Sequence, residues 1–392
     1  MLIPFDDYPV HQTALPLAHA GGGQQDFYDR FWFNGYTEDM YFAVAMGFYP
    51  NRGVLDAAFS VVRDGVQRSV FASGRMPADR TRTRIGPIDI EIVDPLRVNR
   101  VRVDAPEHGL VADLMFSSRT PVCEEPRQTR WSGTRLWMDA TRATSLGTWS
   151  GSLKVAGNRI RVPKGMYGTK DRSWGLRPVA DPAAAAPDQQ LPQIFFLWAP
   201  LNFEDECLHF LVFEDSDGVA WARTGARLPL LGKGEPIVGD GGSPGIEHVS
   251  VRHSVRWAEG FRRSEGATLS VTTRDGVQAV ELEPINTFRM RGVGYGHPDY
   301  PHGRWHDELM VAGEALPVEE LDGLDLDQVH VQQVVRAKWE GRTGLGVLEQ
   351  LAVGPHAPSG FTELLDGAAP GALGAGPQVR VLPQPAGDVL DE

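Results

Sequence analysis

The chain has 392 residues, of which 42% are hydrophobic and 23% charged, and its formal net charge is −13. This length favours two domains, and the composition is that of a globular protein rather than a disordered one. The acidic balance argues against nucleic acid and anionic membranes as partners, because their phosphate groups are bound by clustered lysines and arginines. A neutral or cationic small molecule fits that balance better.

The N-terminal sequence has neither the basic nor the apolar segment of a secretory signal. No stretch reaches the roughly 18–20 apolar residues of a membrane span. We therefore expect a cytoplasmic protein with no stable membrane insertion. Its two cysteines, Cys123 and Cys207, allow at most one disulfide, and no sequence context marks either as reactive.

Short segments of β type, broken by turn dipeptides, dominate the chain. Asp-Gly or Gly-Asn pairs divide four of these segments into two strands each, because such pairs supply the positive φ of tight hairpin turns. These hairpins are expected at residues 59–71, 152–162, 210–224 and 269–283. Further strands are expected at residues 88–95, 99–106, 110–118, 194–203, 247–258 and 330–340.

Antiparallel strands in this number usually close into barrels or sandwiches, because closure removes exposed edges. Residues 179–193 contain three prolines and no hydrophobic periodicity, and we place the linker between the domains there. The N-terminal domain then spans residues 1–185 and the C-terminal domain residues 186–366. Residues 367–392 form a low-complexity tail that we expect to be poorly ordered.

Residues 27–50 hold a large share of the aromatic side chains, and Glu38 and Asp39 lie at the start of a strand within them. A carboxylic acid among aromatic rings has its pKa raised by desolvation, as a general acid requires. The alternative is that the rings form core and both acids lie at a solvated strand end. The aromatic candidates for substrate binding in this segment are Trp32, Tyr36 and Tyr41.

Glycines bracket Asp171, Arg172 and Trp174 within residues 165–179. A glycine-rich strand end lets the backbone approach a ligand or another strand closely. Asp171 is a candidate acid or base, and Trp174 a candidate for substrate binding. The alternative is a structural bulge closed by an ion pair from Asp171 to Arg172 or Arg177.

Residues 292–309 contain His297, His302 and His306 together with several carboxylates. Such clusters invite a metal interpretation, but the spacing matches no common zinc motif. We favour histidine as a hydrogen-bond donor or a general acid or base, and a turn-rich loop with satisfied histidines is the alternative. The aromatic candidates for substrate binding in this segment are Tyr295 and Trp305.

Residues 341–356 contain Gly-x-Gly-x-x-Glu rather than the dinucleotide fingerprint. No βαβ unit surrounds it, so we exclude NAD binding. Glu349 faces either inward, as a ligand for substrate, or outward to water, and strand alternation leaves both open.

Residues 170–175 read Lys-Asp-Arg-Ser-Trp-Gly and resemble the RDHSWG signature of one superfamily. It contains hydroxyneurosporene synthase, a carotenoid 1,2-hydratase, and the AttH-type lipocalin-like proteins. Residues 294–305 and 344–350 resemble motifs of a two-domain branch of that superfamily. Residues 38–42, Glu-Asp-Met-Tyr-Phe, are similar to the Glu-Ser-x-Tyr-Phe motif of the same branch.

The resemblance implies an all-β fold of two consecutive lipocalin-like antiparallel β-barrels and no organic cofactor. It also implies a hydrophobic substrate, often a terpenoid or polyketide, that is hydrated, cyclised or carried through a pericyclic step. Arg172 stands where the superfamily usually has histidine. If that histidine is catalytic in relatives, the chemistry here differs. If it only braces the aspartate, arginine can do so as an ion pair.

We favour a cofactor-independent enzyme that protonates a C=C bond of a terpenoid-, steroid- or polyketide-like molecule, as hydratase or dehydratase, isomerase or cyclase. Aromatic faces would stabilise the cation by about 0.5–2 kcal/mol per ring. The alternatives are a non-catalytic binding or carrier protein and metal-assisted chemistry at residues 297–307. No metal is assigned, and homodimerisation stays open. The catalytic candidates are Asp171, Glu38, Arg172, His297 and His302. The candidates for substrate binding are Trp32, Tyr36, Tyr41, Trp174, Tyr295, Trp305 and Glu349.

Overall fold

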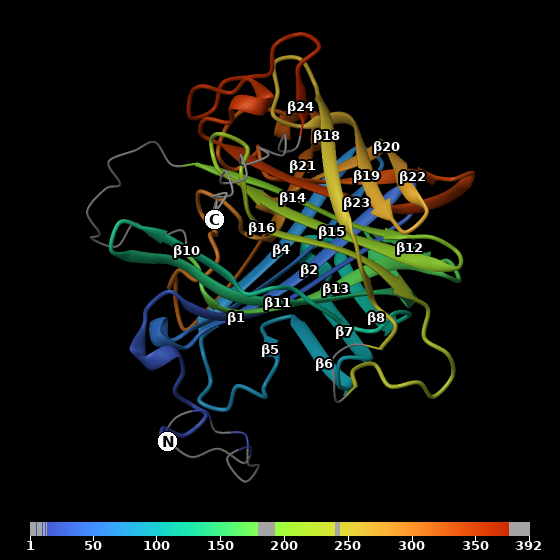
Figure 1. Ribbon diagram of the computed structural model, residues 1–392. Coiled ribbons are helices and arrows are strands. Elements are labelled where there is room, and N and C mark those ends of the chain that lie inside the picture. Colours follow the sequence, from blue (N-terminus) through green and yellow to red (C-terminus); the bar gives the residue numbers. More distant parts are fainter. Residues whose placement is uncertain are drawn as a thin grey trace, which may run out of the picture.

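The computed structural model describes Phe5, Val10, Gln12 and residues 14–178, 193–239 and 244–375. Strands and short 3-10 helices make up the regular structure of this part of the chain (Figure 1). No helix within it is long and apolar enough to cross a membrane. The predicted all-β fold is confirmed. The expected linker, apart from its last residue, Gln193, lies outside the described residues.

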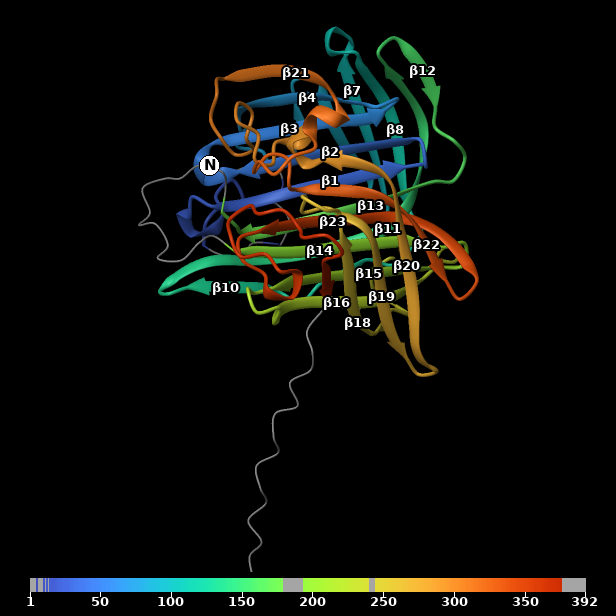
Figure 2. The same cartoon turned by 90° about the horizontal axis from the view of Figure 1, so that it is seen from above.

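The first sheet has 14 antiparallel strands and curves into a nearly closed barrel (Figure 2). Its order is β21 (Leu309–Pro317), β4 (Val66–Arg75), β3 (Val54–Arg63), β2 (Met40–Tyr49), β1 (Phe27–Tyr36), β13 (Met166–Leu176), β11 (Arg135–Val155), β8 (Leu110–Ser118), β7 (Val98–Ala105), β6 (Ile88–Asp94) and β5 (Arg84–Ile85). Three short strands also pair with β11, namely β9 (Cys123–Glu124), β10 (Gln128–Ser132) and β12 (Asn158–Arg161).

The second sheet has ten antiparallel strands and forms a half-barrel. Its order is β17 (Glu247–His248), β16 (Ala220–Pro229), β15 (Glu206–Glu214), β14 (Ile194–Asn202), β23 (Arg342–Val353), β22 (Val331–Trp339), β20 (Gly276–Arg289), β19 (Ser264–Thr273), β18 (Ser250–Trp257) and β24 (Leu373–Ala375). The 3-10 helices are η2 (Gly21–Gly23), η3 (Pro50–Arg52), η4 (Pro106–His108), η5 (Met290–Val293), η6 (Val318–Leu321) and η7 (Ala357–Ser359).

Two strands from the C-terminal half lie where the sequence did not place them. β21 follows β20 of the second sheet in the chain, but it pairs with β4 at the edge of the first sheet. The pairing runs from Leu309 opposite Gly74 to Pro317 opposite Val66. β24 belongs to the segment expected to be a tail, yet it pairs with β18. The chain therefore returns to the first sheet after β20 and then goes back to the second.

β1 and β2 are buried along almost their whole length because each has a packed core on both faces. Alternate side chains of a strand point to opposite faces of its sheet. Phe31 and Phe33 point into the first barrel, whereas Trp32 and Tyr36 point toward the second sheet. This two-sided burial explains why β2 has no charged residue, whereas Asp29, Arg30 and Asn34 interrupt the apolar sequence of β1.

The layer between the two sheets is aromatic and is crossed by hydrogen bonds. Tyr41 of β2 stacks on Phe288 of β20, with ring centroids 4.7 Å apart. The amide of Asn34 donates to Gln332 Oε1 over 3.0 Å. Together these contacts tie the sheets into one packed unit.

Phe288→Ala is expected to lower the free energy of unfolding by about 3–5 kcal/mol, the usual cost of removing a large core aromatic. The side chain is fully buried, and its loss removes the ring on which Tyr41 stacks. Urea unfolding followed by tryptophan fluorescence measures the change. Val277→Ala, at a 70% exposed residue of the same strand, is the control, and it should stay within about 0.5 kcal/mol of wild type. A loss below about 1 kcal/mol for F288A would contradict a tightly packed layer.

Candidate functional site

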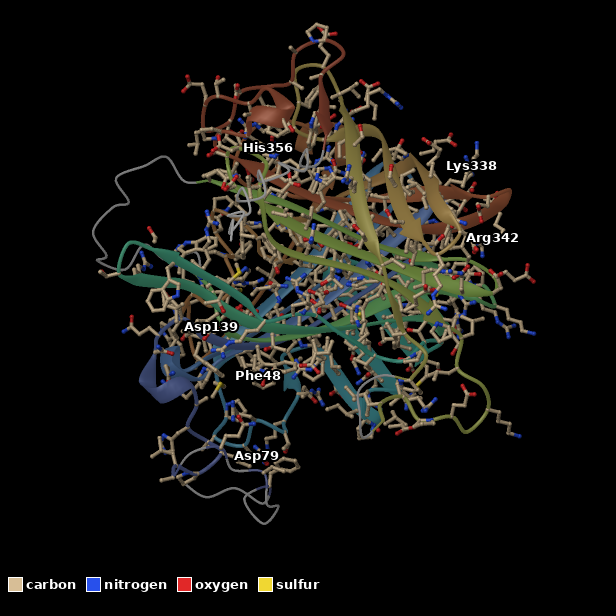
Figure 3. The ribbon with its side chains drawn as sticks, viewed as in Figure 1. Phe48, Asp79, Asp139, Lys338, Arg342 and His356 are labelled. Atoms are coloured by element: carbon tan, nitrogen blue, oxygen red, sulfur yellow. The ribbon has the colours of Figure 1, made fainter. Side chains whose placement is uncertain are left out.

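A partly enclosed cavity of about 280 Å³ lies between the two sheets. We call it the inter-sheet pocket. Side chains from β1, β11 and β13 of the first sheet line it, together with side chains from β14, β15 and β23 of the second. The rest of the lining consists of Gln128, Arg177, Pro178, Met290, Tyr295, Gly296, His302 and His330. Asp139, labelled in Figure 3, marks the end of β11 that borders the pocket, on the side of the view opposite Lys338 and Arg342.

The interior of the first barrel is filled by side chains. The rings of Phe33, Phe116 and Trp149 meet edge to face there, with centroids 5.2, 5.7 and 5.8 Å apart. A second, more open hollow of about 1320 Å³ lies at the mouth of this barrel, beside Phe31 and Arg172. The enclosed space is therefore built by the packing of two sheets rather than by a barrel lumen.

One wall of the inter-sheet pocket is apolar. It consists of Trp32 from β1, Phe196 and Trp198 from β14, Phe213 from β15 and Leu351 from β23. The indole N–H groups of Trp32 and Trp198 are buried without a hydrogen-bond partner. The wall thus offers aromatic rings to an apolar ligand, and it contains two indole N–H groups without a partner.

Asp171 faces this pocket from β13 and is 6% exposed. Burial raises the pKa of its carboxyl to about 6, against the opposing charge of Arg142. Its Oδ2 lies 3.8 Å from Arg142 Nε, and its Oδ1 is buried without a hydrogen-bond partner. A carboxyl of this kind exists in both protonation states near neutral pH, and one of its oxygens has no hydrogen-bond partner.

Arg142 is held between Asp171 and a second buried carboxylate, that of Glu125, whose Oε2 lies 3.8 Å from Arg142 Nε. Glu125 Oε1 in turn lies 2.9 Å from His209 Nε2 on the second sheet. Gln128 donates a further hydrogen bond to Glu125 over 3.0 Å. Close contacts therefore connect Asp171, through Arg142 and Glu125, to His209 on the other sheet.

His330 and Glu349 form a second titratable pair in the same pocket. His330 Nε2 lies 2.7 Å from Glu349 Oε1, and Gln332 donates to the other carboxylate oxygen over 2.6 Å. Burial by itself would raise the pKa of Glu349, but the hydrogen bonds from His330 and Gln332 hold that pKa below its usual range. Glu349 is thus a buried carboxylate kept ionised by its partners.

The third polar feature is the ring of Tyr295, which packs edge to face against His302 and His330. Arg30 and Arg177 both lie against the same ring. Burial, followed by the charges of these two arginines, holds the pKa of His302 well below its usual range. His302 is therefore neutral near pH 7.

The structure brings five of the sequence candidates together on the pocket wall: Asp171, Trp32, Tyr295, His302 and Glu349. Of the two orientations left open for Glu349, the structure has the inward one. Tyr36 and Tyr41 are fully buried in the layer between the sheets, outside the pocket lining. Tyr36 accepts a hydrogen bond from Asn202 over 3.0 Å.

The other candidates lie away from the pocket. Glu38 is in the turn between β1 and β2 and pairs with Arg336 over 2.7 Å, its side chain 54% exposed. Asp39 beside it is exposed as well, which corresponds to the solvated strand end considered above. Trp174 is 40% exposed and Trp305 is 43% exposed.

Arg172 lies on the opposite face of β13 from Asp171, because neighbouring residues of a strand alternate. Its guanidinium pairs with Asp29 over 2.6 Å and lies 3.9 Å from the centroid of the Phe31 ring. The ion pair considered between Asp171 and Arg172 is not formed, and Arg142 of β11 occupies that position instead.

The three histidines of residues 292–309 have separate partners. His297 lies 3.3 Å from Glu314, and His302 lies 3.0 Å from the hydroxyl of Tyr49. His306 packs near Tyr300. Across the described ranges, no group of three His, Cys, Asp or Glu side chains is placed to hold a metal ion.

Among the charged and imidazole side chains of the pocket, sequence reasoning missed Arg30, Arg142 and His330, and it considered Arg177 only as a structural partner of Asp171. Arg30 gave one usable signal, since it is a charged residue inside the aromatic segment at residues 27–36 and shares strand parity with Trp32. No sequence signal marked Arg142 or His330 as a pocket residue, because each lies on a segment distant in sequence from Asp171.

The model of a family of unknown function (DUF8625) matches residues 2–362 of the chain. Among solved structures, the chain is similar to the crystal structure of a "putative AttH" from Nitrosomonas europaea. The two share 14% identity with a TM-score of 0.49, over 87% of this chain and 98% of that chain. No curated protein matches the sequence. The fold assignment therefore rests on the strand pairings themselves.

The raised pKa of Asp171 predicts a pH-dependent stability difference between the wild type and Asp171→Asn. The folded-state pKa of about 6 lies above the ordinary 3.8, so the native state binds more protons between these values. The stability of the wild type relative to the variant should therefore fall as pH rises through this window, by about 3 kcal/mol in total. Urea unfolding at intervals between about pH 3 and about pH 7 measures it.

Asp113→Asn is the matched control with the opposite sign. Its hydrogen bond to Arg100 lowers the pKa of Asp113. Wild-type stability relative to that variant should therefore rise with pH, from below the ordinary carboxyl range upward. A stability difference for D171N that does not change with pH would contradict a buried carboxyl with a raised pKa.

Proposed function

The chain belongs to a family of unknown function (DUF8625), and we propose that its inter-sheet pocket is the active site of an acid/base enzyme. The substrate is a small, largely apolar, unsaturated molecule, and Asp171 transfers the proton. The observation that carries this proposal is a buried carboxyl with one free oxygen, beside an aromatic wall, with a pKa of about 6. General acids and bases work best with a pKa near the working pH.

The first step is protonation of one carbon of a C=C bond by the Asp171 carboxyl. The resulting carboxylate is stabilised by Arg142, 3.8 Å away. The positive charge that develops on the other carbon is stabilised by the faces of Trp32 and Phe196, at about 0.5–2 kcal/mol per ring. The chain's own groups thus stabilise both charges that this step creates.

Two completions return the proton to Asp171. In hydration, water adds to the cationic carbon and its proton passes to the Asp171 carboxylate. In isomerisation, a carbon next to the cation loses a proton to the same carboxylate and a new C=C bond forms. His330, which is hydrogen-bonded to Glu349, lines the same pocket.

The resemblance of residues 170–175 to the superfamily of hydroxyneurosporene synthase supports hydration of a terpenoid-like substrate as one form of this reaction. The proposed enzyme is cytoplasmic and needs no organic cofactor. The second candidate function is a binding or carrier protein for the same kind of molecule. The enclosure of the pocket and the unused indole donors of Trp32 and Trp198 favour it.

Proton transfer to carbon is tested by incubating the protein in deuterium oxide with an apolar extract of its producing cells. Mass spectrometry then finds any molecule that gains deuterium or the mass of water. We expect Asp171→Asn to lower the rate of this change by about 10²–10⁴-fold, the usual contribution of a general acid. Glu38→Gln, at the exposed turn, should leave the rate unchanged.

Wild-type rates in D171N would exclude Asp171 as the acid. If a molecule from the extract binds both wild type and D171N with equal affinity and neither protein changes its mass, the carrier function replaces the enzymatic one. Binding is measured separately, by native mass spectrometry of the loaded protein.

A further inference from the structure

Two arginines of the inter-sheet pocket have no carboxylate partner. Arg30 is 3% exposed, and its Nε and Nη1 atoms are buried without a hydrogen-bond partner. Among the described residues, no carboxylate oxygen lies within 4.0 Å of the guanidinium of Arg30 or Arg177. Buried guanidinium groups are normally paired, because an unpaired buried charge costs several kcal/mol.

Both guanidinium groups converge on one ring. The Cζ atoms of Arg30 and Arg177 lie 4.5 and 5.6 Å from the centroid of Tyr295. Arg177 also lies 4.7 Å from the centroid of the Tyr28 ring. All four residues line the inter-sheet pocket. The two positive charges therefore share one end of the cavity.

The carboxyl groups around this end are engaged elsewhere. Asp171 lies beside Arg142, and Glu349 is bound by His330. Asp56 accepts a hydrogen bond from the backbone N–H of Gly303, and burial raises its pKa to about 6 although Arg30 opposes this. None of these groups fully neutralises both arginines.

We infer that Arg30 and Arg177 bind the carboxylate of the substrate, so that the pocket takes an unsaturated apolar carboxylic acid. The inference rests on the proposed function for the fate of the double bond, but the binding of the carboxylate does not depend on it. Guanidinium groups present paired donors that match a carboxylate. The apolar chain then lies along Trp32, Phe196 and Phe213, where Asp171 can reach it.

A neutral hydrocarbon fits the same pocket less well. It would cover the aromatic wall but would leave both guanidinium groups without a carboxylate partner, at a cost that a bound carboxylate removes. His302 is neutral, so the end of the pocket around Tyr295 carries the positive charges of Arg30 and Arg177 without a third one.

Isothermal titration with decanoate and with 1-decanol at about pH 7.5 tests the inference. The two probes share a ten-carbon chain and differ in the charge of the head group. We expect wild type to bind decanoate at least about 10-fold more tightly than 1-decanol, and Arg177→Gln to abolish most of this preference. Arg75→Gln, at a 63% exposed arginine outside the pocket, is the control and should keep it.

Arg30→Lys is a second variant that controls for the case in which a charge-removing substitution disrupts the fold. It keeps the positive charge, so it should retain part of the preference, and its thermal unfolding shows whether the fold survives. Equal affinity of wild type for both probes, or no binding of either, would overturn the inference. So would an unchanged preference in a folded R177Q.

Asp171→Asn separates this inference from the proposed function. D171N should bind decanoate at least as tightly as wild type, because it removes a negative charge from the pocket, while its deuterium incorporation is lost. If the preference for decanoate is absent but D171N still abolishes incorporation, only the carboxylate inference fails. If the preference is present but D171N incorporates deuterium at the wild-type rate, only the proposed acid role fails.

Discussion

The packing of β1 and β13 against β14 and β23 is the constraint on which the site depends. It places Asp171, Arg142 and Glu125 in a medium of low dielectric constant, where each charge alone costs several kcal/mol. The charges are tolerable because Arg142 lies between the two carboxylates, and the contact of Glu125 with His209 links this group to the second sheet. The packing of the two sheets and the electrostatics of the pocket therefore depend on each other.

Local turn chemistry made much of the fold predictable from the sequence. The hairpin expected at residues 59–71 is β3–β4, and its Asp64-Gly65 turn has φ of 52° and 74°. The hairpin expected at residues 152–162 is β11–β12, with its positive φ one residue earlier than expected, at Ala156 and Gly157. The return of β21 to the first sheet had no such signal, because that pairing joins residues more than 230 positions apart and depends on the assembled edge of β4.

Strand parity explains what the sequence could and could not say about the site. Tyr28, Arg30 and Trp32 share one face of β1, and Asp171 and Ser173 share one face of β13. Alternation groups such residues correctly, but it does not tell which face meets the second sheet. Long-range packing alone decided that Asp171 rather than Glu38 lines the pocket, and that Arg142 rather than the expected Arg172 or Arg177 lies beside Asp171.

The net charge of −13 suggested a neutral or cationic ligand, whereas the pocket carries Arg30, Arg142 and Arg177 on its wall. The two facts are compatible because they act over different distances. Surface charges are screened by salt within about 8–10 Å, whereas groups inside a desolvated pocket act on a ligand almost unscreened. A bound molecule therefore experiences the arginines around Tyr295 more strongly than the acidic exterior. The net charge of the chain therefore gives little information about the charge of a ligand bound in this pocket.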